Sequence, residues 1–182
     1  MAQAGIRACA ADALVSRSLT SVPDLRPPSP SADLRPRARG TEVIVLAAGK
    51  AAAGMARGAL GVAARGLVVA PTGVDDLPEA YECVVGGHPS PNAGSEEGGR
   101  KALALAESLS ADDTLLVLLS GGASALMAVP ADGIALDEKR TTSDRLMREG
   151  ADIHALNTVR KHLSQIKGGW LAARTRARTV AL

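Results

Sequence analysis

Short apolar runs alternate with amphipathic segments between residues 41 and 119. Two runs, TEVIVLAA at 41–48 and TLLVLL at 114–119, are composed almost entirely of aliphatic and β-branched residues, which is typical of strands buried on both faces. Strands that alternate with helices form a parallel sheet covered by helices. The pattern therefore predicts an α/β fold with three α/β/α layers and a mainly parallel sheet. The other predicted elements in this region are strands at 66–70 and 82–85 and helices at 51–60 and 95–109.

The two ends of the chain differ from this alternating region. Residues 1–21 predict an N-terminal helix, centred on 6–19, and residues 22–40 are rich in proline, serine and arginine, which predicts a linker or surface loop. Two consecutive helices are predicted at 137–149 and 152–165, with a break at Gly150, and residues 179–182 predict the start of a further strand. We expect residues 41–182 to belong to one domain.

The helix predicted at 152–165 and the residues after it have two distinct faces. Apolar residues recur at spacings of three and four on one face, and polar residues follow one another on the other. Such a polar row is usually a solvated helix face, although the same residue types also line anion sites. The apolar residues are Ile153, Leu156, Val159, Leu163 and Ile166, and the polar ones are Asn157, Arg160, Lys161, Ser164 and Lys167.

Composition limits the class of protein. The 182 residues are 46% hydrophobic, which suffices for one core, but they include no Phe, one Trp and one Tyr, so small aliphatic side chains must allow close packing of helices on the sheet. A net charge of +2 is too balanced to indicate a nucleic-acid partner, and no apolar run approaches the ~20 residues of a membrane span. Cys9 and Cys83 lie far apart without neighbouring metal ligands. These features fit a cytoplasmic enzyme and leave small anionic ligands open.

Three glycine-containing loops follow predicted strands, where ligands of open α/β sheets bind. In the first, Gly49 permits a sharp turn and Lys50 adds a positive charge at the start of a helix. In the third, two prolines stiffen a loop that displays His88 and Asn92. An exposed lysine and an ordinary structural turn are the competing interpretations of the first two loops. The second loop, which offers two hydroxyl groups to an anion, consists of Ser120, Gly121, Gly122, Ala123 and Ser124.

Neither common nucleotide-binding fingerprint occurs at the expected place. The segment after the first strand reads GKAAAG at 49–54, which matches neither G-x-x-x-x-G-K-[ST] nor G-x-G-x-x-G. The second strand ends at Ala70 and Pro71 rather than in an acidic residue that would hold a ribose. A standard NAD site is therefore disfavoured, whereas mononucleotide or phosphometabolite binding through another loop geometry stays open.

Three segments resemble the glycerate 2-kinase family, whose members carry a C-terminal MOFRL domain. They are GKAAAGMA at 49–56, SGGASAL at 120–126 and LNTVRKHLSQIKGG at 156–169, of which the last is the longest and most specific. The resemblance covers roughly residues 41–182, and it includes the loop GGHPSPNAGSEEGG at 86–99. It implies that this region is a Rossmann-like first domain.

The resemblance also implies an activity, which is transfer of a phosphoryl group from ATP, with Mg²⁺, to the C2 hydroxyl of D-glycerate, giving 2-phosphoglycerate and ADP. Such a transfer depends mainly on positioning and charge neutralisation. Lys50 matches a lysine thought to be catalytic in the family and would stabilise the transferring phosphoryl group or the substrate carboxylate. Residues 120–124 would cradle an anionic group. The further binding residues expected around the cleft are Gly49, Asn92, Asn157, Arg160, Lys161 and Lys167.

The remaining catalytic roles are less well defined by the sequence. His88 is the side chain that we expect to act as general base towards the attacking hydroxyl. The metal ligands stay unknown, because no carboxylate pair identifies itself. Asp112 and Asp113 precede the strand at 114–119, at the end opposite the expected cleft, and predict a turn.

Members of the family continue past the strand predicted at 179–182 into the rest of the first domain and the MOFRL domain, so we expect this chain to lack part of the site. Two other functions stay open: a hydroxypyruvate reductase, which shares the small hydroxy-acid substrate, and a non-catalytic remnant that binds a phosphometabolite. The missing dinucleotide fingerprint argues against the reductase. The sequence leaves open whether the protein forms a homodimer.

We predict that the purified 182-residue chain alone has little or no D-glycerate-dependent ATP turnover, because a half-open site admits water and lacks part of its ligand set. A coupled assay for ADP release, with and without D-glycerate, measures this. Robust glycerate-dependent turnover would contradict the expectation.

Overall fold

The computed structural model describes residues 10–22, 25 and 42–182. The predicted linker at 22–40 lies outside the described residues apart from Val22 and Leu25, and so do residues 6–9 of the predicted N-terminal helix. No helix in the described ranges is long and apolar enough to cross a membrane. The helices are α2 (Ala11–Thr20), α3 (Ala52–Gly58), α4 (Ala93–Ser108), α5 (Ala123–Leu126), α6 (Leu136–Arg148), α7 (Ile153–His162) and α8 (Trp170–Ala173), and the strands are β1 (Val43–Ala48), β2 (Arg65–Ala70), β3 (Tyr81–Val85), β4 (Thr114–Leu119) and β5 (Arg178–Ala181).

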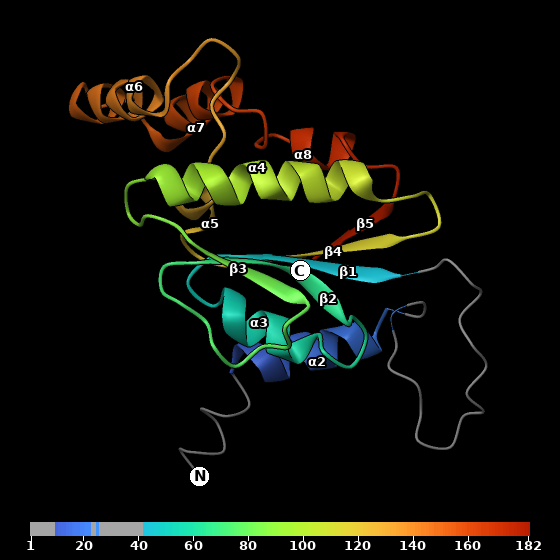
Figure 1. Cartoon of the computed structure of the whole chain (residues 1–182). Helices are drawn as coiled ribbons and strands as arrows, with labels where there is room; N and C mark the ends of the chain where they lie inside the picture. The colour runs from blue at the N-terminus through green and yellow to red at the C-terminus, as the bar shows by residue number, and fades with distance from the viewer. Residues whose placement is uncertain (1–9, 23–24, 26–41) are drawn as a thin grey trace, which may run out of the picture.

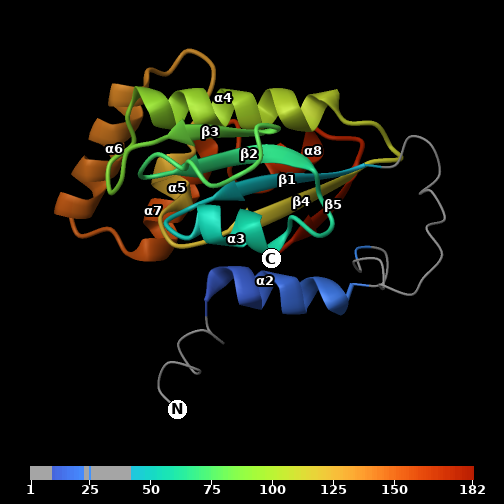
Figure 2. The ribbon, with the colours of Figure 1, turned by 60° about the horizontal axis from the view of Figure 1, so that its bottom comes forward.

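The strands of the described region form one sheet with the order β3-β2-β1-β4-β5, and every neighbouring pair is parallel. Helices α2 and α3 cover one face, whereas α4 and α8 lie on the other (Figure 1). Helices α5, α6 and α7 gather beyond the carboxyl ends of the strands (Figure 2). The predicted α/β fold with three α/β/α layers and a parallel sheet is confirmed.

The sheet separates two hydrophobic cores, and β1 contributes to both. All six of its residues are buried, and successive side chains point to opposite faces. Ile44 and Leu46 belong to the core under α4, whereas Val43 and Val45 belong to the core against α2 and α3. Burial on both faces is the reason that this strand reads as an unbroken apolar run.

Small residues allow α4 to lie close to the sheet, as the composition predicts. A Cβ atom added at Gly98 would lie 2.8 Å from Val69 Cγ1, and one added at Gly99 would lie 2.6 Å from Val129 Cγ2. Both distances are far below ordinary contact, so a larger side chain at Gly98 would push α4 away from the sheet, and one at Gly99 would push it away from the segment that follows α5.

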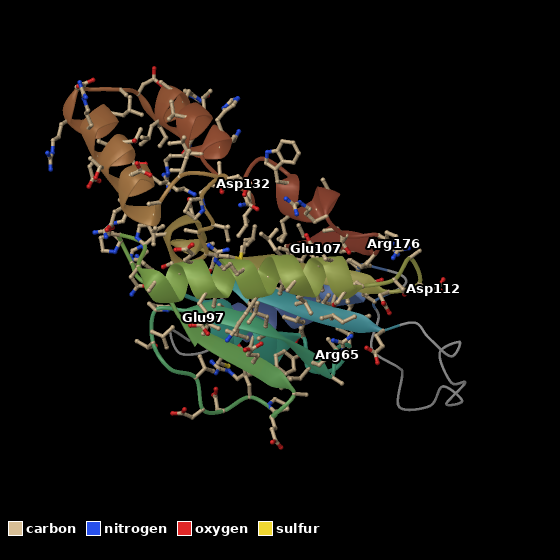
Figure 3. The ribbon with its side chains drawn as sticks, turned by 45° about the horizontal axis from the view of Figure 1, so that its top comes forward. Arg65, Glu97, Glu107, Asp112, Asp132 and Arg176 are labelled. Atoms are coloured by element: carbon tan, nitrogen blue, oxygen red, sulfur yellow. The ribbon has the colours of Figure 1, made fainter. Side chains whose placement is uncertain are left out.

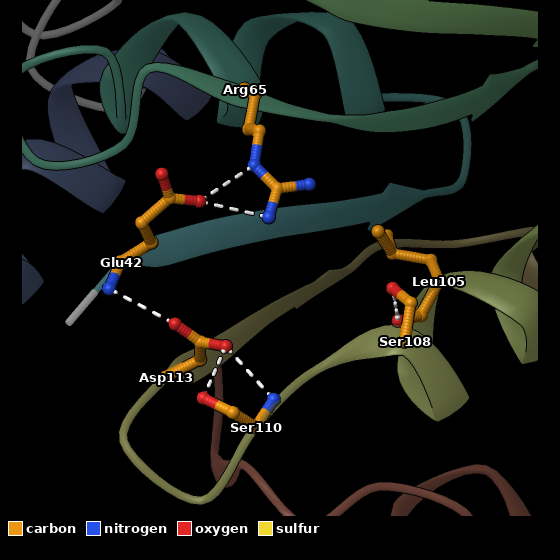
Figure 4. A network of polar contacts seen from close by, with 6 residues as sticks. All are labelled: Glu42, Arg65, Leu105, Ser108, Ser110 and Asp113. Atoms are coloured by element: carbon orange, nitrogen blue, oxygen red, sulfur yellow. Dashed lines mark hydrogen bonds and ion pairs between the residues drawn. The ribbon is translucent and has the colours of Figure 1, made fainter. Parts of the chain in front are cut away.

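Polar contacts close the end of the sheet at which β1 and β4 begin (Figure 4). The Asp113 carboxylate accepts hydrogen bonds from the backbone N–H of Glu42 at 3.1 Å and from the Ser110 N–H and hydroxyl at 2.9 and 2.8 Å. These donors, the Ser110 N–H foremost, lower the pKa of Asp113. Asp112 lies at this same end, away from α6 and α7 (Figure 3). Both aspartates therefore belong to the turn before β4, as predicted.

The C-terminal helices differ in part from the prediction. Helix α7 ends at His162 rather than near residue 165, and Ile153, expected on its buried face, is 59% exposed. The early end of the helix has a tertiary cause. The Gln165 N–H and the Ser164 hydroxyl both donate hydrogen bonds to Val129 O, so the chain leaves the helix and pairs with the segment near Pro130. Residues 163–169 thus form a turn, and the apolar stripe is interrupted.

Two adjacent leucines on β4 test the two-sided core. Leu118 is fully buried, whereas Leu119 is 46% exposed. We predict that Leu118→Ala lowers the free energy of unfolding by about 2–5 kcal/mol, because it leaves a cavity, and that Leu119→Ala costs less than about 1 kcal/mol. Urea unfolding followed by circular dichroism measures both, and equal losses for the two variants would show that the strand faces are misassigned.

Candidate active site

The candidate site lies where the direction of the strand order reverses. From β1 the chain proceeds to β2 and β3 on one side of the sheet, and the strands on the other side of β1 are β4 and β5. The loops that leave β1 and β4 therefore lead to helices on opposite faces, and in open α/β sheets a crevice for ligands forms between such loops. These are the loops with Gly49 and Lys50 and with residues 120–124.

Direct bonds hold these two loops together. The Ser120 hydroxyl accepts a hydrogen bond from the N–H of Ala51 at 3.0 Å, and the Lys50 N–H donates to Gly121 O at 2.9 Å. Gly49 has a φ of +129°, and a Cβ added there would lie 2.1 Å from Ser120 Oγ. Only glycine allows this approach. The Lys50 side chain is exposed beside the junction.

The third loop meets the second at a glycine as well. Gly122 has a φ of +91°, and its missing Cβ would lie 2.6 Å from Cδ2 of the His88 ring. The His88 loop is fixed from behind, because the buried Ser95 hydroxyl accepts hydrogen bonds from the N–H groups of Gly87 and Asn92, at 2.8 and 3.1 Å. The three loops predicted to carry the chemistry thus converge, with His88 exposed at their edge.

Asn92 has a structural task in this arrangement. Its side-chain oxygen accepts a hydrogen bond from the N–H of Ser95 at 3.0 Å, and the Ser95 hydroxyl accepts one from the N–H of Asn92. The two bonds form the capping box at the start of α4. The cap explains the presence of Asn92 without a ligand. Its predicted role in binding therefore stays a prediction.

Two cations from the C-terminal segment meet at Ser124. The Arg160 guanidinium donates to the Ser124 hydroxyl at 2.7 Å, and Lys167 Nζ donates to the Ser124 carbonyl at 2.8 Å. Arg160 lies on α7 and Lys167 in the turn that follows it. The pairing of this turn with the segment near Pro130 is thus what brings Lys167 back over the second loop.

A hollow of about 680 Å³ lies on the β4–β5 side of this contact. Its walls include apolar side chains of β4, β5 and α8 together with the loop at 120–124. A volume of this size is within the range of small-molecule sites. The predicted site residues that line it are Ser120, Gly122, Ala123, Ser124, Asn157, Arg160, Lys161 and Lys167.

A second hollow, of about 330 Å³, lies between α6, α7 and the loop after β3. Ser124, Arg160 and Lys167 line this hollow too, so they form the wall between the two. Lys139 on α6 also reaches it and is only 5% exposed. The sequence analysis missed Lys139, because it stands in the segment DEKR, which reads as a solvated helix face.

Two lysines that line this hollow, the buried Lys139 and the half-buried Lys167, have depressed pKa values. Burial, followed by the nearby charges of Lys139 and Arg160, lowers the pKa of Lys167 to about 7. Burial and the charge of Arg160 lower the pKa of Lys139 to about 8, against a smaller opposing effect of Glu96. The region is therefore rich in positive charge that the protein does not neutralise, which is suited to an anion.

The donor set does not suit a metal ion. No group of three or more His, Cys, Asp or Glu side chains in the described part of the chain could hold one. Lysines, arginines and hydroxyl groups surround the loops instead, and Mg²⁺ prefers carboxylate, phosphate and water oxygens.

Known proteins resemble this chain in sequence. A D-glycerate 2-kinase of Thermotoga maritima is 40% identical over 153 residues, which are 81% of this chain and 37% of that protein. A glycerate 2-kinase of Pyrococcus horikoshii is 39% identical over 72% of this chain and 30% of its own length. A putative hydroxypyruvate reductase of Agrobacterium vitis is 39% identical over 76% of this chain and 32% of its own length. The chain spans about a third of the length of these relatives.

The fold and the family agree with these relatives. The crystal structure of a glycerate kinase from Thermotoga maritima superposes with a TM-score of 0.81 at 34% identity, and the match covers 98% of this chain and 41% of that one. The sequence profile of one family matches residues 1–182. The chain belongs to that family, which is described as the domain of unknown function DUF4147.

Proposed function

We propose that this chain provides the loop-bearing part of a kinase that transfers the γ-phosphoryl group of ATP to the C2 hydroxyl of D-glycerate. The observation that carries the proposal is the convergence of three glycine loops where the strand order reverses, with two cations bonded to Ser124 at the end of the second loop. Relatives named glycerate 2-kinase share this part of the chain, which agrees with the proposal.

The transfer requires few covalent contributions from the protein. The C2 oxygen attacks the γ-phosphorus, the bond from that phosphorus to the β-phosphate bridging oxygen breaks, and the hydroxyl proton passes to a base. Negative charge accumulates on the transferring oxygens, so fixed positive groups lower the barrier. We assign that task to Lys50 and the backbone N–H groups of residues 120–124. Arg160 and Lys167, which bond to Ser124 and line both hollows, serve in binding the substrate.

His88 is the general base in this proposal. Its ring lies against Gly122, on the loop that also carries Ser124, and its side chain is exposed beside that loop, outside the lining of the two hollows. A base must come within hydrogen-bond reach of the proton that it removes. We assign the base to His88 rather than to His154 or His162 because His88 lies against the second loop, whereas those two lie exposed on α7.

Mg²⁺ enters the proposal as a companion of the nucleotide, because magnesium in such sites takes most of its ligands from phosphates and water. The described residues do not offer a carboxylate cluster for it, so we derive no step through the ion. A cytoplasmic location and a homodimer stay predictions.

The relative named as a putative hydroxypyruvate reductase makes reduction of hydroxypyruvate the second candidate activity. The first loop of this chain does not have the glycine pattern of a dinucleotide site, and β2 ends at Ala70 without an acidic residue. Kinase chemistry therefore has the better support.

A chimaera tests the proposal, with this chain in place of the aligned region of the Thermotoga maritima enzyme. We expect D-glycerate-dependent ADP formation, and we expect Lys50→Ala to lower kcat by about 10²-fold or more with little change in the melting temperature, because the exposed side chain adds little to the core. Lys101→Ala, on the solvent side of α4, is the matched control and should retain full activity.

Two results would count against the kinase. One is a folded chimaera without turnover, and the other is NADH oxidation with hydroxypyruvate in place of ADP release. A parallel loss of stability and activity in Lys50→Ala would remove the catalytic assignment of that lysine.

A further inference from the structure

The hollow between α6 and α7 contains more positive charge than the proposed chemistry at Ser124 requires. It is bounded by the loop after β3, by α6, by α7 and by the turn that holds Lys167. Its volume is about 330 Å³. The polar side chains that matter here are Ser90, Ser124, Lys139, Arg140, Arg160 and Lys167.

Lys139 is the most deeply placed of these cations. It is 5% exposed, and its ammonium group donates one hydrogen bond, to Val129 O at 3.3 Å. No carboxylate in the described ranges lies within ion-pair distance of Lys139, Arg160 or Lys167. Lys139 is buried, whereas Arg160 and Lys167 are half-buried. A buried charge without a counter-ion destabilises a fold, so three cations without a carboxylate partner around one hollow indicate a bound anion that supplies the missing charge.

The other charged groups near the hollow leave this imbalance in place. Arg140 bonds to Asp137 and to the Ser90 hydroxyl, so its charge is already partly neutralised. Asp144 stands on the α6 wall but is exposed to water. Glu96, which faces Lys139 from α4, is engaged by Arg100.

We infer that the hollow between α6 and α7 is a carboxylate-binding subsite in which Lys139, Arg160 and Lys167 hold the acid group of a small hydroxy acid. The inference rests on the proposed function and deepens it, because it separates the position of the acid from that of the nucleotide. Lys139 is a binding residue in it.

The sizes of the two hollows support this division. At about 330 Å³, the smaller one is near the lower end of small-molecule sites and suits a three-carbon acid, whereas the neighbouring hollow of about 680 Å³ has room for a nucleotide. Ser124, Arg160 and Lys167 line both, so an acid anchored at Lys139 would place its hydroxyl near the wall that the two hollows share.

Binding to the 182-residue chain tests the inference without any turnover. By calorimetric titration at pH 6.5, we expect Lys139→Met to weaken D-glycerate binding by about tenfold or more, since a charge-assisted hydrogen bond is lost, and to leave the dissociation constant of ATP unchanged. Lys101→Met is the control and should bind both ligands as the unmodified chain does. Glycerol, which has the hydroxyls but not the acid group, should not bind measurably.

The pH dependence of D-glycerate binding distinguishes a binding role of Lys139 from a purely structural one, because a structural role would leave this dependence unchanged in the Lys139 variants. An anion prefers the protonated lysines, so raising the pH through the pKa of Lys167, about 7, and that of Lys139, about 8, should weaken D-glycerate binding. Lys139 is one of the charges that lower the pKa of Lys167, so Lys139→Met should shift the midpoint of the remaining dependence to higher pH. Arg160, Arg140 and Asp144 line the same hollow, Glu96 acts on Lys139 from α4, and none of them changes in this variant.

Lys139→Met should remain folded, because it removes an uncompensated buried charge, and Lys139→Gln is a second variant of the same kind. Unchanged D-glycerate binding in both variants, or glycerol binding as tight as that of D-glycerate, would overturn the inference. So would inorganic phosphate binding that depends on Lys139 when D-glycerate binding does not. A chimaera that is inactive as a kinase, beside normal Lys139-dependent D-glycerate binding, would instead refute the proposed function alone.

Discussion

The contact between the loops that follow β1 and β4 is the constraint on which the site depends. Two adjacent parallel strands deliver these loops to the same edge, but their onward helices lie on opposite faces of the sheet. The Ser120 hydroxyl joins the two loops by accepting a hydrogen bond from the N–H of Ala51. This contact is possible only because Gly49 has no side chain that would occupy the same space. The site is therefore a property of the strand order, held in place by one hydroxyl and one glycine.

The rest of the site is attached to this junction in layers. The His88 ring packs against Gly122, and Arg160 and Lys167 donate hydrogen bonds to Ser124. Helices α3 and α5 are short, with seven and four residues, so their dipoles contribute little to anion binding. The positive charge must come from side chains, and the burial of one of them, Lys139, has a cost in stability. Sites of function commonly carry such a cost.

Much of the fold could be predicted from the sequence because burial on both faces leaves an unmistakable pattern. β4 begins and ends at the predicted residues, and β1, β2 and β3 differ by one or two. The end of α7 could not be predicted, since residues 163–166 read as helix until the pairing with the segment near Pro130 is known.

The same distinction holds for the site residues. Gly49, Lys50 and the loop at 120–124 could be singled out from the sequence because they follow buried strands, where ligands of open α/β sheets bind, and their roles stay predictions. Lys139 could not, because its surroundings in sequence are charged and only the packing of α6 against the segment near Val129 buries it. Asn92, a polar residue in a rigid loop, has a sufficient structural explanation as a helix cap, and its role in binding stays a prediction.

The central claim is that the junction of the two loops and the cations around Ser124 form two adjacent anion subsites that share one wall. The most direct test is a crystal structure of this chain soaked with D-glycerate and a non-hydrolysable ATP analogue. The account predicts the acid group between Lys139 and Lys167 in the hollow under α6 and α7, and phosphate oxygens on the other side of Ser124, beside the loop at 120–124. Ligand density at a different edge of the sheet, with both hollows filled by water alone, would contradict it.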